Sequence, residues 1–185
     1  VELFINHRSL GKVTQPTDGC IFAFPNVAFE PGVIKAIGSS SGKVVCTDQI
    51  ETAGAPTRLK LTAHTGPKGL QADGSDVALI DVEVVDAQGR RCPTDEARVD
   101  FAVDGPLVWR GGYNSGKPGS TNNLFLDTEC GINRVSIRST LKPGTITIRV
   151  TRNGLEPAML KLESEPVDIQ AGLEKSLPPR LGLEQ

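Results

Sequence analysis

The chain has one tryptophan and one tyrosine, Trp109 and Tyr113, and they lie close together in a segment rich in glycines, amides and hydroxyls. Sugars bind proteins by stacking their apolar C–H faces on aromatic rings, while amides and charged groups hydrogen-bond the sugar hydroxyls. Segment 107–123 has this chemistry, so we predict a carbohydrate-contact site there. The candidate contact residues are Trp109, Arg110, Tyr113, Asn114 and Asn122.

Two alternatives compete with sugar contact in segment 107–123. In the first, Trp109 fills the core of a β-sandwich, as one buried tryptophan commonly does in such folds, and Tyr113 caps a loop through its hydroxyl. In the second, the segment contacts another domain or another subunit. A phosphate-binding loop is disfavoured, because Pro118 follows Lys117 where that motif needs a hydroxyl residue, and proline offers no N–H to a phosphate.

The other residues that could do chemistry do not form a catalytic or metal-binding set. The two histidines, His7 and His64, fall in different segments, and no two cysteines have the C-x-x-C spacing typical of zinc sites. Asp73 and Asp76 flank a Gly-Ser turn, and Asx hydrogen bonding accounts for them without a calcium ion. We therefore predict no catalytic residue, no metal and no cofactor.

Charge and hydropathy argue against two classes of partner. The 20 Lys and Arg residues nearly balance the 22 Asp and Glu residues, and the formal net charge of −2 lacks the basic character of a nucleic-acid-binding domain. No apolar run approaches the roughly 18 residues that indicate a membrane-spanning segment. The sequence predicts neither a nucleic-acid partner nor a membrane partner.

Alternating apolar and polar residues predict the strands that position these segments. In 99–103 and 146–150, for example, one face is apolar and the other polar, which is typical of an antiparallel sheet solvated on one side. Turn signals such as Asp73-Gly74 and Pro143-Gly144 separate the strands, and no long window sustains a helical period. The predicted fold is all-β, with two β-sandwiches in tandem.

A linker of small residues, Thr52–Pro56, marks the predicted domain boundary. We expect an incomplete domain at 1–53, a complete β-sandwich at 54–165, and a proline-containing tail or linker at 166–185. Because the chain opens directly on a strand pattern at Val1, we expect a fragment of a longer chain whose first sandwich is truncated at its N-terminus.

The first segment resembles a bacterial enzyme family. Val1–Asn6 followed by Ser9–Gly11 resembles the V-E-L-F-L-N-G-x-S-L-G signature of glycoside hydrolase family 2, although His7 stands where that signature has glycine. Phe29–Ala36 is similar to the Y-x-P-G-x-L-x-A pattern of the family, and Thr52–Pro56 to its T-A-G-x-P boundary. In the family, these motifs belong to an immunoglobulin-like domain that follows the catalytic barrel and normally begins with a further strand or two.

The second segment resembles the last domain of the same β-galactosidase-like enzymes. Leu70–Gly74, Val82–Asp86 with Gly89, and Val99–Phe101 follow its L-x-A-D-G … V-x-V-x-D-x-x-G … V-x-F pattern, which invasin-type bacterial immunoglobulin-like domains share. The resemblance covers roughly residues 1 to 163. It implies two tandem immunoglobulin-like β-sandwiches.

The resemblance also implies a function. The chain would be a non-catalytic C-terminal accessory fragment of a β-galactosidase-like enzyme, because the two catalytic glutamates of the family lie on a (β/α)₈ barrel and no residue here matches that barrel. Its expected partner is that barrel in the parent chain, with glycan contact and oligomerisation as further expectations and a periplasmic or extracellular location. Two alternatives remain: an immunoglobulin-like adhesion or cell-surface module, and a carbohydrate-binding module.

The four cysteines fall two to each segment, Cys20 and Cys46 in the first and Cys92 and Cys130 in the second. Since the resembling enzymes are often exported, one disulfide in each domain, Cys20–Cys46 and Cys92–Cys130, is one expectation. Free thiols are the alternative, because four cysteines in 185 residues do not make a disulfide-dense chain and a free cysteine packs as a small hydrophobe.

Overall fold

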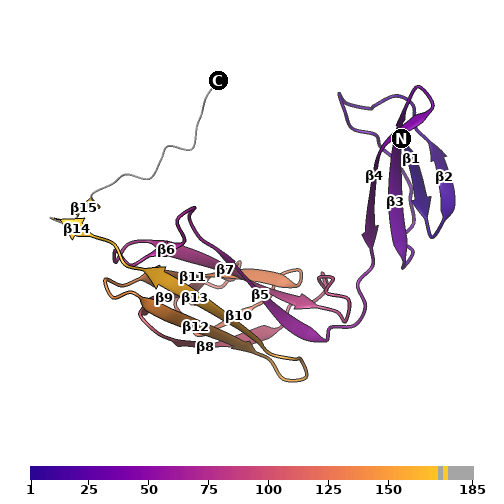
Figure 1. Ribbon diagram of the computed structural model, residues 1–185. Helices are drawn as coiled ribbons and strands as arrows, with labels where there is room; N and C mark the ends of the chain where they lie inside the picture. The colour runs from indigo at the N-terminus through magenta and orange to yellow at the C-terminus, as the bar shows by residue number, and fades with distance from the viewer. Residues whose placement is uncertain (171–172, 175–185) are drawn as a thin grey trace. The chain divides into compact units, whose positions relative to one another are not determined.

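The computed structural model describes residues 1–170 and 173–174 (Figure 1). Contacts divide the chain into two compact units, unit 1 (Val1–Gly54) and unit 2 (Ala55–Gln185). The described residues form strands and turns without a helix, which confirms the all-β prediction. Among them, no helix is long and apolar enough to cross a membrane. Of the predicted tail at 166–185, residues 171–172 and 175–185 lie outside the described part, and β14 (Ile169–Gln170) pairs with β15 (Leu173–Glu174).

Unit 1 contains one antiparallel sheet with the strand order β2-β1-β3-β4. Its strands are β1 (Glu2–Ile5), β2 (Arg8–Lys12), β3 (Val33–Ser40) and β4 (Lys43–Glu51). A single sheet stands here where the sequence predicted an incomplete sandwich. Its apolar side chains are poorly covered: Ile5 is buried, but Val44, Val45 and Ile50 are 65%, 64% and 70% exposed.

The Asn6 side chain connects two motifs of the first segment, the turn at Asn6 and the Pro31-Gly32 pair before β3. Asn6 and His7 form the β1–β2 turn with φ of 47° and 69°, a left-handed pair that asparagine tolerates well. The amide of Asn6 donates to Pro31 O (2.9 Å) and accepts from Val33 N (2.9 Å). Gly32 has φ 126°, and a Cβ at that position would overlap the Asn6 side chain. The two motifs are therefore one structural feature that joins the turn to β3.

Unit 2 is a sandwich of two sheets, with strand orders β5-β7-β11-β9 and β10-β8-β12-β13-β6 (Figure 1). All pairings are antiparallel except that of β13 with β6. The first sheet contains β5 (Arg58–His64), β7 (Val77–Val85), β11 (Ile132–Ser139) and β9 (Leu107–Gly112). The second contains β10 (Phe125–Asp127), β8 (Arg98–Asp104), β12 (Gly144–Thr151), β13 (Ala158–Glu165) and β6 (Leu70–Gln71).

The core of unit 2 is built by alternate residues of both sheets. Successive side chains of a strand point to opposite faces, so every second residue faces the partner sheet. The side chains with no exposed surface include Ala78, Ile80, Val82, Val84, Val99, Ile137, Ile146, Ile148 and Val150. The polar residues between them lie on the outer faces, as the alternation predicts. This sandwich carries segment 107–123, for which the sequence predicts sugar contact.

Candidate functional site

Segment 107–123 consists of an edge strand and a long loop. Residues 107–112 form β9, the last strand of its sheet, and the loop then crosses the edge of the sandwich to β10 of the other sheet. Phe101 N donates to Leu124 O (2.8 Å), which attaches the end of the loop to β8. The segment thus bridges the two sheets along one edge of unit 2.

Trp109 is half-buried, and its ring packs toward the facing sheet of the sandwich. Its ring lies 5.3 Å from the ring of the buried Phe101 on the facing sheet, at an interplanar angle of 46°. Its indole N–H donates to Asn123 O (3.0 Å). Trp109 therefore packs the two sheets together and anchors the returning loop, which is the arrangement that the core-filling alternative describes.

Asn114 is a buried loop anchor, only 3% exposed. Its side-chain amide donates to Asp127 O (2.9 Å) and to a Glu129 carboxylate oxygen (3.0 Å), and its carbonyl oxygen accepts from Asp127 N (2.9 Å). Its backbone N–H donates to the Ser120 hydroxyl (2.8 Å). The amide of Asn114 and the backbone N–H of Ser115 hold the pKa of Glu129 below its ordinary value. These contacts tie the start of the loop to β10.

The other three candidate residues are exposed. Arg110 and Asn122 lie at the surface, and Tyr113 is 53% exposed. Asn122 adopts φ 64°, and its backbone approaches Gly111 so closely that a Cβ on this glycine would lie 2.9 Å from Asn122 N. The structure thus separates the five candidates into two residues that hold the loop, Trp109 and Asn114, and three that are available to a ligand.

Replacing Asn114 with alanine is expected to loosen the loop and to lower the free energy of unfolding by about 2 kcal/mol, because buried donors and acceptors lose their partners. The measurement is denaturant unfolding, with hydrogen exchange at the Asp127 and Ser115 amides. The exposed Thr121, in the same loop, supplies the control variant Thr121→Ala, with an expected change within about 0.5 kcal/mol. Equal effects of the two substitutions would contradict the anchoring role.

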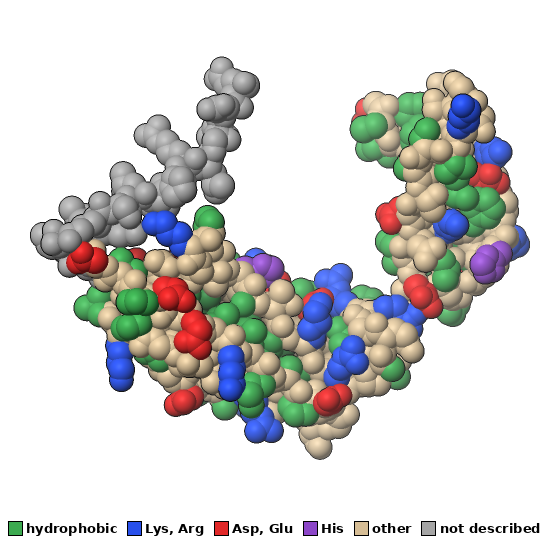
Figure 2. Space-filling model, viewed as in Figure 1, with side chains coloured by type: hydrophobic (Ala, Val, Ile, Leu, Met, Phe, Trp, Pro, Cys, Tyr) green, Lys and Arg blue, Asp and Glu red, His purple; other side chains and the backbone are tan. Residues whose placement is uncertain are grey.

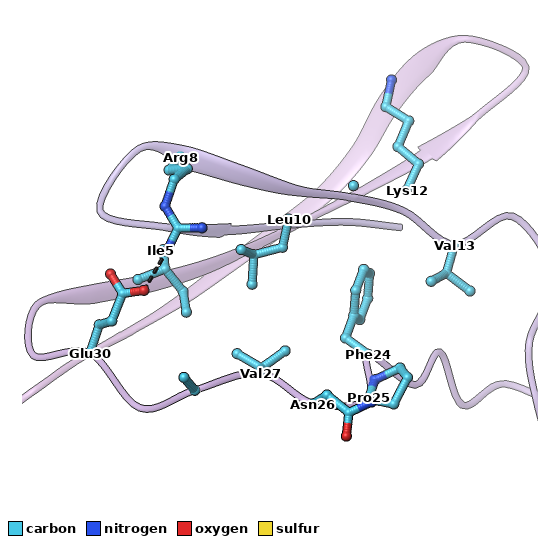
Figure 3. A pocket seen from close by; sticks show the side chains of 12 residues that line it. Ile5, Arg8, Leu10, Lys12, Val13, Phe24, Pro25, Asn26, Val27 and Glu30 are labelled. Carbon is cyan, nitrogen blue, oxygen red and sulfur yellow. Dashed lines mark hydrogen bonds and ion pairs between the residues drawn. The ribbon is translucent and has the colours of Figure 1, made fainter.

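Unit 1 contains a cavity of about 470 Å³ between β1, β2 and the segment 24–30 (Figure 3). Ile5, Leu10, Phe24 and Val27 point toward one another across it, and an ion pair between Arg8 and Glu30 lies at one end. Sequence reasoning missed this cavity, because only the fold brings the Phe24 segment over β2. Its walls are mainly apolar, and no second titratable pair accompanies Arg8 and Glu30 among its lining residues.

The histidines and the acidic turns occupy ordinary structural positions. His64 lies on the outer face of β5, where its Nε2 is 2.9 Å from Asp81. The Arg134 guanidinium above all, with His64, holds the pKa of Asp81 below its usual range. Asp73 accepts from the backbone N–H groups of Ser75 and Asp76 at 2.7 and 2.6 Å, the Asx hydrogen bonds that the turn predicts. Within residues 1–170 and 173–174, no three His, Cys, Asp or Glu side chains are grouped as metal ligands would be.

The structure joins neither predicted cysteine pair by a disulfide. Cys92 is buried, whereas Cys130, Cys20 and Cys46 are exposed. Burial above all raises the pKa of the Cys92 thiol. Cys130 has φ 54° in the turn that leads into β11, which suits a turn residue.

The comparisons with known proteins agree on one family. Residues 59–161 match the family described as Glycoside hydrolase family 2 C-terminal domain 5, and residues 1–46 match a domain of unknown function, DUF4982. The chain is 55% identical to a β-glucuronidase of Formosa agariphila over 178 residues, which cover 96% of this chain and 18% of the relative. It is 37% identical to a β-galactosidase of Bacteroides ovatus, over 89% of this chain and 19% of that protein.

Solved structures show the same relationship. A β-glucuronidase from glycoside hydrolase family 2 matches with a TM-score of 0.88 and 55% identity, over 96% of this chain and 18% of that one. A family 2 member from Bacteroides cellulosilyticus matches with a TM-score of 0.78 and 29% identity, over 87% of this chain and 22% of that one. The chain therefore spans less than a quarter of the length of these relatives. Both the sequence match and the fold show that the chain belongs to glycoside hydrolase family 2, as a C-terminal part of that family.

Proposed function

We propose that the chain is the non-catalytic C-terminal accessory region of a glycosidase and that it supports a catalytic (β/α)₈ barrel elsewhere in the same protein. The observation that carries the proposal is the match of nearly the whole chain, at 55% identity, to only 18% of a β-glucuronidase. Most of that relative has no counterpart in these 185 residues.

The surface of unit 1 supports an accessory role. Phe29 is 81% exposed, and Val44 and Ile50 on the edge strand β4 are 65% and 70% exposed. Several large, exposed apolar side chains in one small unit are typical of a surface that another protein part covers. Docking against the barrel, or against a second subunit, would remove these side chains from water.

Kinetics on chromogenic substrates test the proposal. The longer protein that carries these residues is expected to hydrolyse an aryl β-glucuronide, with an aryl β-galactoside as the second substrate, since the relatives named above carry both names. The isolated 185-residue chain is expected to hydrolyse neither. Hydrolysis by the isolated chain would overturn the accessory role, and so would a longer protein without glycosidase activity.

A further inference from the structure

The outer face of β9 and β11 is basic. These two neighbouring strands carry three arginines, Arg110, Arg134 and Arg138, and no acidic residue. Elsewhere on unit 2 the charges are mixed, and Figure 2 shows acidic and basic side chains interspersed over the face in view. The presence of basic residues without acidic ones on two adjacent strands is therefore a local feature of this part of unit 2.

Arg110 and Arg138 are exposed residues of two neighbouring strands. Arg110, the residue that follows Trp109 on β9, is exposed. Arg138 is likewise exposed, next to the fully buried Ile137. The register places Arg138 opposite Val108, while Arg110 is the extra residue of a bulge between the next two pairs. The two arginines thus lie exposed on adjacent strands.

Two of the three guanidinium groups have no partner among residues 1–170 and 173–174. Arg134 is held by Asp81, with N–O distances of 2.5 and 3.0 Å. Arg110 and Arg138 make no hydrogen bond and no ion pair with any residue in the described part of the chain. The nearby acids are already engaged, because Asp81 binds Arg134 and His64, and Glu129 binds the start of the loop. Arg110 and Arg138 keep their full donor capacity for a ligand.

An aromatic ring and apolar side chains border the two free arginines. Tyr113, 53% exposed, follows Gly112, which pairs with Val135, so the tyrosine lies at the level of Arg134. On the other side of β11, Val77 and Leu79 on β7 are 42% and 37% exposed. Val77 lies opposite Arg138 in the sheet. These neighbouring strands and the residue that follows β9 therefore offer cations, a ring for stacking and apolar contact.

We propose that this face, the β9–β11 arginine face, binds glycans that carry uronate carboxylates. A guanidinium is a planar fork that matches a carboxylate through two parallel hydrogen bonds, and an exposed tyrosine ring suits the C–H face of a pyranose. A uronate residue presents both groups at once. A nucleic acid is the weaker fit, since the net charge of the chain is −2 and the basic area is confined to two strands.

The inference goes beyond the proposed accessory function. An accessory region needs only to support the barrel, whereas this face would hold an acidic polysaccharide by itself. Direct binding tests the inference and needs no hydrolysis. A failure to bind glycan would leave the accessory role standing, and a lack of glycosidase activity in the longer protein would leave the binding result standing.

Isothermal titration of the full 185-residue chain tests the site, with an alginate oligosaccharide as the polyuronate and a neutral galactan oligosaccharide of equal length. We expect the alginate to bind and the galactan not to bind. The double variant Arg110→Gln/Arg138→Gln is expected to weaken alginate binding at least about tenfold, because two charge-assisted hydrogen-bonding groups are lost. Tyr113→Ala, a change at an exposed side chain, is expected to weaken it as well.

Two further variants test whether binding depends on the paired hydrogen bonds of a guanidinium or on positive charge alone. Arg149→Gln is the matched control, because Arg149 is an exposed arginine on β12 in the opposite sheet that also lacks a partner among the described residues; it should bind alginate normally. The double variant Arg110→Lys/Arg138→Lys keeps the positive charge but loses the planar, two-donor geometry of the guanidinium. We expect it to bind alginate more weakly than the unchanged chain. Equal binding of galactan and alginate, normal binding by the double Gln variant, or equal losses with Arg149→Gln would overturn the proposal.

Discussion

Replacement of Trp109 with alanine is expected to lower the free energy of unfolding of unit 2 by about 3 kcal/mol. The substitution removes the ring that packs 5.3 Å from Phe101 on the facing sheet, and it leaves a cavity at the edge of the sandwich. It also removes the donor to Asn123 O, which holds the returning loop. Denaturant unfolding followed by Phe-sensitive near-ultraviolet circular dichroism measures the loss.

Two variants separate packing from the hydrogen bond. Trp109→Phe keeps an aromatic ring beside Phe101 but loses the indole N–H, so its expected cost is only about 1 kcal/mol. Tyr113→Ala changes a half-exposed side chain of the same segment and should alter stability by no more than about 0.5 kcal/mol. If Trp109→Ala left stability unchanged and instead abolished alginate binding, Trp109 would be a ligand contact rather than a core residue.

Replacement of Asp86 with alanine is expected to cost about 3 kcal/mol, because two backbone N–H groups and the half-buried Arg90 side chain lose a charged acceptor. Asp86 is only 1% exposed. One carboxylate oxygen accepts from Gln88 N and Arg90 N, both at 2.9 Å, and the other accepts from Arg90 Nε at 2.7 Å. These bonds build the turn after β7 that the V-x-V-x-D-x-x-G pattern encodes, with Gly89 at φ 83°.

An exposed ion pair supplies the control for Asp86. Asp100 pairs with Arg98 at 2.5 Å, but the two side chains are 50% and 54% exposed. Asp100→Ala is therefore expected to cost at most about 1 kcal/mol, because solvent screens the pair. Thermal unfolding of both variants measures the difference. Similar costs for the two substitutions would show that the Asp86 turn contributes no more to stability than a surface ion pair.

Much of unit 2 could be predicted from the sequence because its pattern is local. The alternation of Ile146, Ile148 and Val150 with polar neighbours matches the buried and outward positions of β12. The spacing of Asp86 and Gly89 likewise indicates a turn at the end of β7. Period-two hydrophobicity depends only on neighbouring residues, so strands and their buried faces follow from it directly.

The candidate site was less predictable, because its residues are related through the fold. Composition placed Trp109, Asn114 and Tyr113 in one candidate group. The structure turns Trp109 inward and buries Asn114 against Asp127, while Tyr113 stays at the surface. Which side chain faces out depends on the register of β9 with β11 and on the bulge at Arg110. That register depends on pairing between strands that are distant in the sequence, so a short stretch of sequence cannot predict it.

Local patterns and short motifs in the sequence were enough to establish the all-β class, the turns, the family and the lack of the barrel motifs. The tertiary structure was needed to show that Arg110 and Arg138, far apart in the chain, are exposed on adjacent strands without a partner among the described residues, while Arg134 is held by Asp81. It was also needed to show that the Asn6 turn and the Pro-Gly motif are one feature. The physical reason is that strand pairing and hydrogen bonding between distant segments form only when the chain closes its core.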